Sequence, residues 1–144
     1  MSVLLILFGS LAIYRTLGVF GLPQFLDWTT CARHALATMF VFTGLSHFTP
    51  MRKDFVAMVP PGLPNPEFLV TLTGLLELAA AAGLLFDATR TLAAYSLIAL
   101  LIAMFPANWR AARQGLTLRG RPATHLWIRV PMQLIFIVWA WWVS

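Results

Sequence analysis

Residues 91–109, TLAAYSLIALLIAMFPANW, form a run of 19 residues without a charged side chain. At 1.5 Å per residue, a helix of this length spans about 29 Å, close to the ~30 Å hydrocarbon core of a bilayer. Four further apolar runs of similar length predict helices at residues 2–20, 32–48, 67–86 and 125–143. The pattern predicts an all-α integral membrane protein with one domain over residues 1–144.

The composition also favours lipid as the surrounding solvent. The chain is 60% hydrophobic and 10% charged, with a mean hydropathy of +0.80. A soluble domain usually carries about 25% charged residues. The net charge of +5 could indicate nucleic-acid binding in a soluble protein, but most basic residues here lie between apolar runs. We therefore expect the lipid bilayer as a partner and no nucleic acid. The single Cys31 excludes a disulfide or a CxxC redox pair within one chain.

The first run, residues 2–20, has some features of a signal peptide. No Lys or Arg precedes its apolar part, and no small-residue cleavage motif follows it. We therefore expect it to be retained as a transmembrane helix. Arg15 lies near its end, from where its long side chain can reach the headgroups.

The loops predict the orientation. One side of the membrane would carry six basic residues, Arg52, Lys53, Arg110, Arg113, Arg119 and Arg121, against three on the other, Arg15, Arg33 and Arg90. By the positive-inside rule, the richer side is cytoplasmic. The prediction is a multi-pass protein of the inner (cytoplasmic) membrane, with a cytoplasmic N-terminus and an external C-terminus.

The second loop predicts a further short helix. In MRKDFVAMV, residues 51–59, the apolar Met51, Phe55 and Met58 recur at helical spacing beside basic residues. This is typical of an amphipathic helix in the membrane interface. The following PPGLPNP, residues 60–66, is not expected to be helical.

Polar side chains inside the runs are the candidates for function, because a charge at the centre of a membrane helix costs about 2.5–3.5 kcal/mol on insertion scales. Glu77 lies about ten residues, roughly 15 Å, into its helix. We expect Arg129 to reach toward it within a polar pocket in the cytoplasmic half of the bundle. The predicted catalytic, proton-handling residues are Glu77 and His47, and the predicted ligand-binding residues are Asn108, Arg129, Gln133 and Thr73.

Each of these residues also has a structural interpretation. Glu77 and Arg129 could lock the bundle as an ion pair, and Gln133 could join two helices. His47 could bond a backbone carbonyl, and Asn108 could end its helix. One internal His with one Glu is too few for a closed metal site, so no metal is predicted.

With these motifs assembled, the chain resembles the DoxX-like integral membrane family. The matching motifs, which extend the resemblance over residues 33 to about 140, are GLSHF (44–48), VPPGLP (59–64), TGLLE (73–77), FPAN (105–108) and RVPMQ (129–133). The resemblance implies a four-helix membrane bundle made of the second to fifth runs, with the first run as an addition. It also implies kinship with proteins of quinone-linked sulfur oxidation, membrane oxidoreductase complexes and receptor-assembly chaperones. Fold kinship does not fix function.

Two functions remain open at this stage. The first is a pocket for a small, largely apolar ligand, with quinone as the candidate cofactor, in the membrane subunit of a redox complex with a soluble oxidoreductase. The second is a non-enzymatic membrane scaffold or assembly factor that binds a protein partner through its cytoplasmic loops. The sequence leaves open whether the protein catalyses a reaction and whether it forms a homo-oligomer.

Overall fold

The computed structural model describes residues 2–118, 120–122 and 125–144. Predicted loop residue Arg119 lies outside this part of the chain. The described helices are α1 (Ser2–Val19), a short 3-10 helix η1 (Pro23–Leu26), α2 (Trp28–Ser46), α3 (Arg52–Met58), α4 (Pro66–Gly83), α5 (Arg90–Arg113) and α6 (Leu126–Trp142). A two-residue antiparallel pairing joins β1 (Thr117–Leu118) to β2 (Arg121–Pro122) between α5 and α6. The all-α prediction is confirmed.

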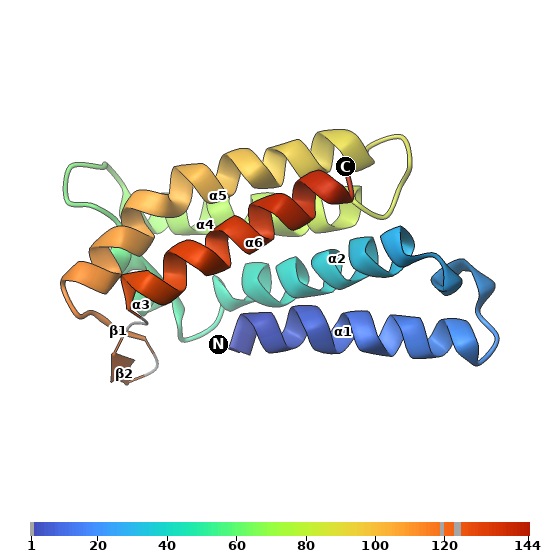
Figure 1. Cartoon of the computed structure of the whole chain (residues 1–144). Helices are drawn as coiled ribbons and strands as arrows, with labels where there is room; N and C mark the ends of the chain where they lie inside the picture. The colour runs from blue at the N-terminus through green and yellow to red at the C-terminus, as the bar shows by residue number, and fades with distance from the viewer. Residues whose placement is uncertain (1, 119, 123–124) are drawn as a thin grey trace.

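The five long helices lie side by side (Figure 1). Helix α2 packs against α4 and α6, and α5 packs against the same two helices, so α2, α4, α5 and α6 form a ring in which α4 and α6 lie diagonally opposite. Helix α1 packs on the outside of α2. The N-terminus, α3 and the β1–β2 pairing lie at one end, the α3 end; η1, the α4–α5 connection and the C-terminus lie at the other, the η1 end (Figure 1).

Local chemistry sets the helix ends. Helix α2 begins at Trp28, four residues before the predicted run, because the Asp27 side chain accepts a hydrogen bond from the Thr30 backbone N–H at 2.7 Å. Helix α4 begins at Pro66, whose fixed φ suits a first helical position. Helix α5 continues four residues beyond the predicted run, with Arg110 and Arg113 in its last turn, where cations are favourable.

The loop predictions hold as well. The short helix expected in the second loop is α3, and Met58 on it is buried against Ala111 of α5. Residues 59–65 then connect α3 to α4 without helix, as the prolines predict. Asn65 completes this turn in the left-handed region at φ 48°.

Two glycines allow α2 and α4 to approach closely. A Cβ on Gly74 would lie 2.7 Å from the Cβ of His47, and a Cβ on Gly44 would lie 2.9 Å from the Cγ of Leu78. Small residues at such crossings are typical of helices that pack through van der Waals contact in membranes. The remaining core is apolar, with Leu36, Met39, Leu84 and Leu97 almost fully buried.

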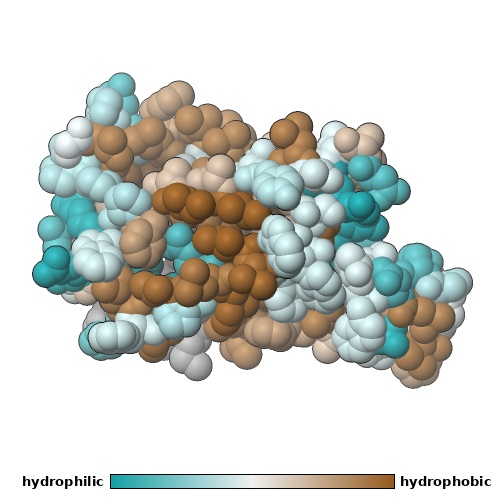
Figure 2. Space-filling view, turned by 45° about the horizontal axis from the view of Figure 1, so that its top comes forward, coloured by the Kyte–Doolittle hydropathy of each residue, from teal (hydrophilic) through white to brown (hydrophobic). Residues whose placement is uncertain are grey.

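Two helices, α4 and α5, are long and apolar enough to cross a membrane. Helices α1 and α6 are apolar but slightly shorter, at Val3–Val19 and Leu126–Trp142. Figure 2 shows hydrophobic residues over the middle of the visible face and hydrophilic residues gathered mainly toward its two ends.

The glycine contact gives a stability prediction. We expect Gly74→Ala to lower the free energy of unfolding by about 1–3 kcal/mol, because the added methyl group overpacks the contact with His47. Thermal unfolding of the purified protein measures this. Gly9→Ala is the matched control, because a Cβ at Gly9 meets nothing within 4 Å and alanine favours a helix. Equal melting temperatures for Gly74→Ala and wild type would contradict the close packing.

Candidate functional site

Glu77 is buried where α4 faces α2. Its side chain is 4% exposed, and its Oε2 accepts a hydrogen bond from the Thr43 hydroxyl at 2.6 Å. The close crossing at Gly44 and Gly74, three residues before Glu77, brings the two side chains together. A buried carboxyl group needs such a partner, because an unsatisfied polar group in an apolar interior is costly.

His47 lies one helical turn beyond Thr43, directly after the last residue of α2. Its Nδ1 is 3.0 Å from the Thr43 carbonyl oxygen, and a carbonyl only accepts, so this nitrogen carries the proton. The ring packs on Phe55 of α3, with centroids 4.7 Å apart, and its Cβ lies over Gly74 of α4. His47 therefore joins the end of α2 to α3 and to the middle of α4, and its hydrogen bond to the Thr43 carbonyl links it to the Glu77 pair.

A second polar contact joins α5 and α6. The Arg129 guanidinium donates to the Asn108 side-chain oxygen at 2.7 Å. One turn further along α6, the Gln133 amide donates to the Leu101 carbonyl at 2.9 Å. This carbonyl lies five residues before Pro106, inside the same helix. Gln133 thus ties α6 to the backbone of α5 at the residue next to Ile102, whose carbonyl loses its helical donor to Pro106.

The Thr73 hydroxyl bonds neither to the Thr43–Glu77 pair nor to the Asn108–Arg129 pair. The hydroxyl lies 3.0 Å from the carbonyls of Leu69 and Val70 in its own helix. Thr73 shares a helical face with Glu77, as the spacing predicts, yet its polar atom is used within α4.

The expected contact between Arg129 and Glu77 is not made. Glu77 bonds to Thr43 instead, and Arg129 donates to Asn108. The ring order gives the reason, because Glu77 and Arg129 stand on the diagonally opposite helices α4 and α6. The expectation of a single cluster built on this pair is therefore wrong.

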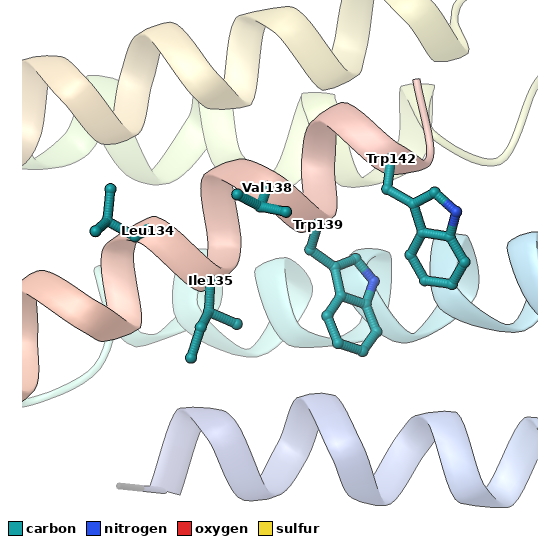
Figure 3. A pocket seen from close by; sticks show the side chains of 5 residues that line it. All are labelled: Leu134, Ile135, Val138, Trp139 and Trp142. Atoms are coloured by element: carbon teal, nitrogen blue, oxygen red, sulfur yellow. The ribbon is translucent and has the colours of Figure 1, made fainter.

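Two hollows in the described surface lie elsewhere. One, of about 360 Å³, is an apolar groove on α6 lined by Leu134, Ile135, Val138, Trp139 and Trp142 (Figure 3). The other, of about 300 Å³, lies between α2 and α3 beside Thr49, Pro50, Met51 and Asp54. None of the six predicted site residues lines either hollow. Ligand binding by those residues stays a prediction.

Several polar contacts between helices were missed by sequence reasoning. The Trp139 indole N–H donates to the Ala32 carbonyl at 3.0 Å, which ties α6 to α2. The hydroxyls of Tyr14 and Thr38 lie 2.9 Å apart and tie α1 to α2. Thr43 could have been noticed, because it lies four residues before His47 within an apolar run. In the part of the chain that the structure describes, no group of three or more His, Cys, Asp and Glu is placed to hold a metal.

Comparison with known proteins places the chain in a family. A family model described as "Domain of unknown function (DUF8561)" matches residues 36–144, which begin within α2 and leave α1 outside the match. No curated protein and no solved structure matches the chain. Since the match covers more than half of the sequence, the chain belongs to the family described as Domain of unknown function (DUF8561).

Proposed function

We propose that this protein is a multi-pass integral membrane protein in which α2, α4, α5 and α6 form the bundle, α1 is an additional span and α3 lies in the interface. Large apolar side chains on the outer faces support this proposal. Leu5 on α1 is 72% exposed, Leu92 on α5 is 71% exposed and Val138 on α6 is 61% exposed. Exposed apolar surface spread over several helices fits acyl chains as the solvent.

We place the α3 end in the cytoplasm, which puts the N-terminus inside and the C-terminus outside the inner membrane. The α3 end carries Arg52, Lys53, Arg110, Arg113 and Arg121 among its described residues, and the sequence adds Arg119 in the same loop. The η1 end carries Arg15, Arg33 and Arg90. The positive-inside rule then orients the chain.

Within this membrane, we infer a non-enzymatic function as a scaffold or assembly factor. One observation carries this proposal: the polar groups inside the bundle bond to other side chains or to helix carbonyls of the protein itself, and these groups belong to Glu77, His47, Arg129 and Gln133. Such bonds specify how helices pair in a membrane. The resemblance to the DoxX-like family belongs to the same proposal, and its assembly-factor members fit this interpretation best.

The partner surface in this proposal is the α3 end. Arg110 of α5 donates to the carbonyls of Ala57 and Val59, and Arg52 donates to the Glu67 carbonyl at 2.9 Å, so both arginines hold α3 and its following turn in place. Lys53 and Arg113 are exposed on the same end. A fixed surface with exposed basic side chains suits a soluble cytoplasmic protein with an acidic docking face.

The orientation is tested by cysteine labelling. We expect a membrane-impermeant maleimide to label Ala88→Cys in intact cells, and Lys53→Cys only after permeabilisation, because these exposed positions lie at opposite ends. Native Cys31 is fully buried and serves as the unlabelled background. Labelling of both variants in intact cells would contradict a spanning bundle, and the reverse pattern would invert the topology.

The role of the buried acid is tested by a double-mutant cycle. Thr43→Val should lower stability by about 1–3 kcal/mol, because it leaves the Glu77 carboxyl without its donor. We expect Thr43→Val combined with Glu77→Met to cost less than the sum of the single changes, by about 1 kcal/mol. Thermal unfolding in detergent gives these energies.

The same cycle separates the two functions. A scaffold keeps its partner when both Thr43 and Glu77 are replaced, provided that the bundle still folds. A ligand-binding protein would lose its activity or a co-purified small molecule in the Glu77 variants. Retention of a quinone by wild type, and its loss on Glu77→Gln with unchanged melting, would overturn the scaffold function.

The partner surface is tested by charge reversal. We expect Lys53→Glu with Arg113→Glu to weaken partner capture in cross-linking and co-purification, with the effect decreasing as salt rises. Arg90→Gln, at the opposite end, is the control and should capture the partner as wild type does. Unchanged capture by the reversed variant would place the partner on another surface.

A further inference from the structure

At the η1 end, two arginines share one carboxylate. The guanidinium of Arg33, on α2, lies 3.0 Å from Oδ1 of Asp87, and that of Arg90, the first residue of α5, lies 3.4 Å from the same oxygen. The Asp87 side chain is 86% exposed, whereas that of Arg33 is only 13% exposed. One carboxylate therefore bridges two cations, and the second carboxylate at this end, that of Asp27, also interacts electrostatically with Arg33.

The two arginines also have donors without acceptors. The Nε atoms of both Arg33 and Arg90 are buried and have no hydrogen-bond partner among the described residues. Buried donors are almost always satisfied in folded proteins, and an ion bound at the site is one explanation for an exception. A single exposed aspartate, screened by solvent, does not account for two guanidiniums held together.

The start of α5 adds to this positive field. Helix α5 has 24 residues and begins at Arg90, so the positive end of its dipole lies beside the arginine pair. The N-cap residue Thr89 does not cap the helix with its side chain, because its hydroxyl donates to the Gly83 carbonyl at 2.8 Å. The field is therefore not offset by a capping side chain.

We propose that Arg33 and Arg90 form a binding site for a phosphate group, carried by an anionic phospholipid headgroup or free in solution. Guanidinium groups bind phosphate oxygens through paired, charge-assisted hydrogen bonds, and two of them supply more donors than Asp87 uses. The lipid source rests on the membrane placement proposed above, which puts the η1 end at the outer headgroup layer. The competing interpretation is that Arg33, Asp87 and Arg90 only clamp α2 to the start of α5.

The lipid source is tested by native mass spectrometry of the detergent-purified full chain with added phosphatidylglycerol. We expect Arg33→Gln and Arg90→Gln each to weaken phosphatidylglycerol binding by roughly tenfold, because each removes charge-assisted donors. Arg113→Gln, which removes the same charge at the α3 end, is the matched control and should bind as wild type does. A phosphate-free glycolipid with the same acyl chains should bind equally to all variants.

Asp87→Asn separates a ligand site from a clamp. In a phosphate site, the aspartate competes with the ligand, so its neutralisation should strengthen phosphatidylglycerol binding relative to wild type. In a clamp, Asp87→Asn lowers the melting temperature and leaves lipid binding unchanged, and that result would overturn the proposal. Arg33→Lys keeps the positive charge but loses the paired N–H donors of the guanidinium. It should bind phosphatidylglycerol with intermediate affinity, which tests the site even if Arg33→Gln misfolds.

The free-phosphate source is tested by thermal shift of the same variants in lipid-free detergent with added sodium phosphate. Two results together assign the site to free phosphate. Phosphate stabilises wild type more than the same concentration of sodium chloride does, and Arg33→Gln loses this effect. The variants also bind phosphatidylglycerol as wild type does. If neither ligand distinguishes wild type from Arg33→Gln and Arg90→Gln, the proposal is wrong. That failure would not contradict the proposed partner surface, because Lys53 and Arg113 lie at the other end of the bundle.

Discussion

The hydrogen bond from Thr43 to Glu77 is the constraint on which the arrangement of the bundle depends. An acidic side chain in an apolar interior must find a donor, and in this protein a single hydroxyl on the neighbouring helix supplies it at 2.6 Å. Helices α2 and α4 meet closely enough for this only because glycines stand at positions 44 and 74. The same crossing seats His47 on Gly74 and brings the end of α2 against α3. One contact thus determines the pairing of two long helices and the position of the short one.

The other helix pairs follow the same rule with different groups. Arg129 and Gln133 hold α6 to α5, Trp139 holds α6 to α2, and Tyr14 holds α1 to α2. Apolar contacts alone distinguish poorly between helix partners when the surrounding solvent is also apolar. One or two directional bonds per interface therefore give each helix a defined neighbour. This distribution explains why the polar residues are spread over the bundle instead of gathering around a hollow.

The sequence predicts the elements well because the relevant signals are local. Apolar run length, the prolines of residues 60–66 and the spacing of Met51, Phe55 and Met58 are all readable within one segment. The predicted meeting of Glu77 and Arg129 needed knowledge of which helices are neighbours, and the apolar runs contain no such information. Both residues do turn toward other helices, as the cost of an unsatisfied polar group in apolar surroundings requires, but α4 and α6 lie diagonally opposite in the ring. Thr43 was missed for a related reason, since a lone threonine in an apolar run is unremarkable until its partner is known.

Arginine side chains at the bundle ends fall into two kinds. Some hold loops in place through backbone carbonyls, and others keep donors that a ligand can use. At the α3 end, Arg52 and Arg110 donate to backbone carbonyls of the loop they support. At the η1 end, Arg15 does the same with the carbonyls of Phe25 and Leu26, which closes the turn between α1 and α2. Arg33 and Arg90 are the contrast, because both point at one exposed carboxylate and keep buried N–H groups without acceptors. The fold explains the position of an arginine that bonds a backbone carbonyl. It does not explain why two arginines share one carboxylate and have more donors than that carboxylate accepts from. The surplus of donors around Asp87 is therefore the feature that favours an anionic partner at the η1 end.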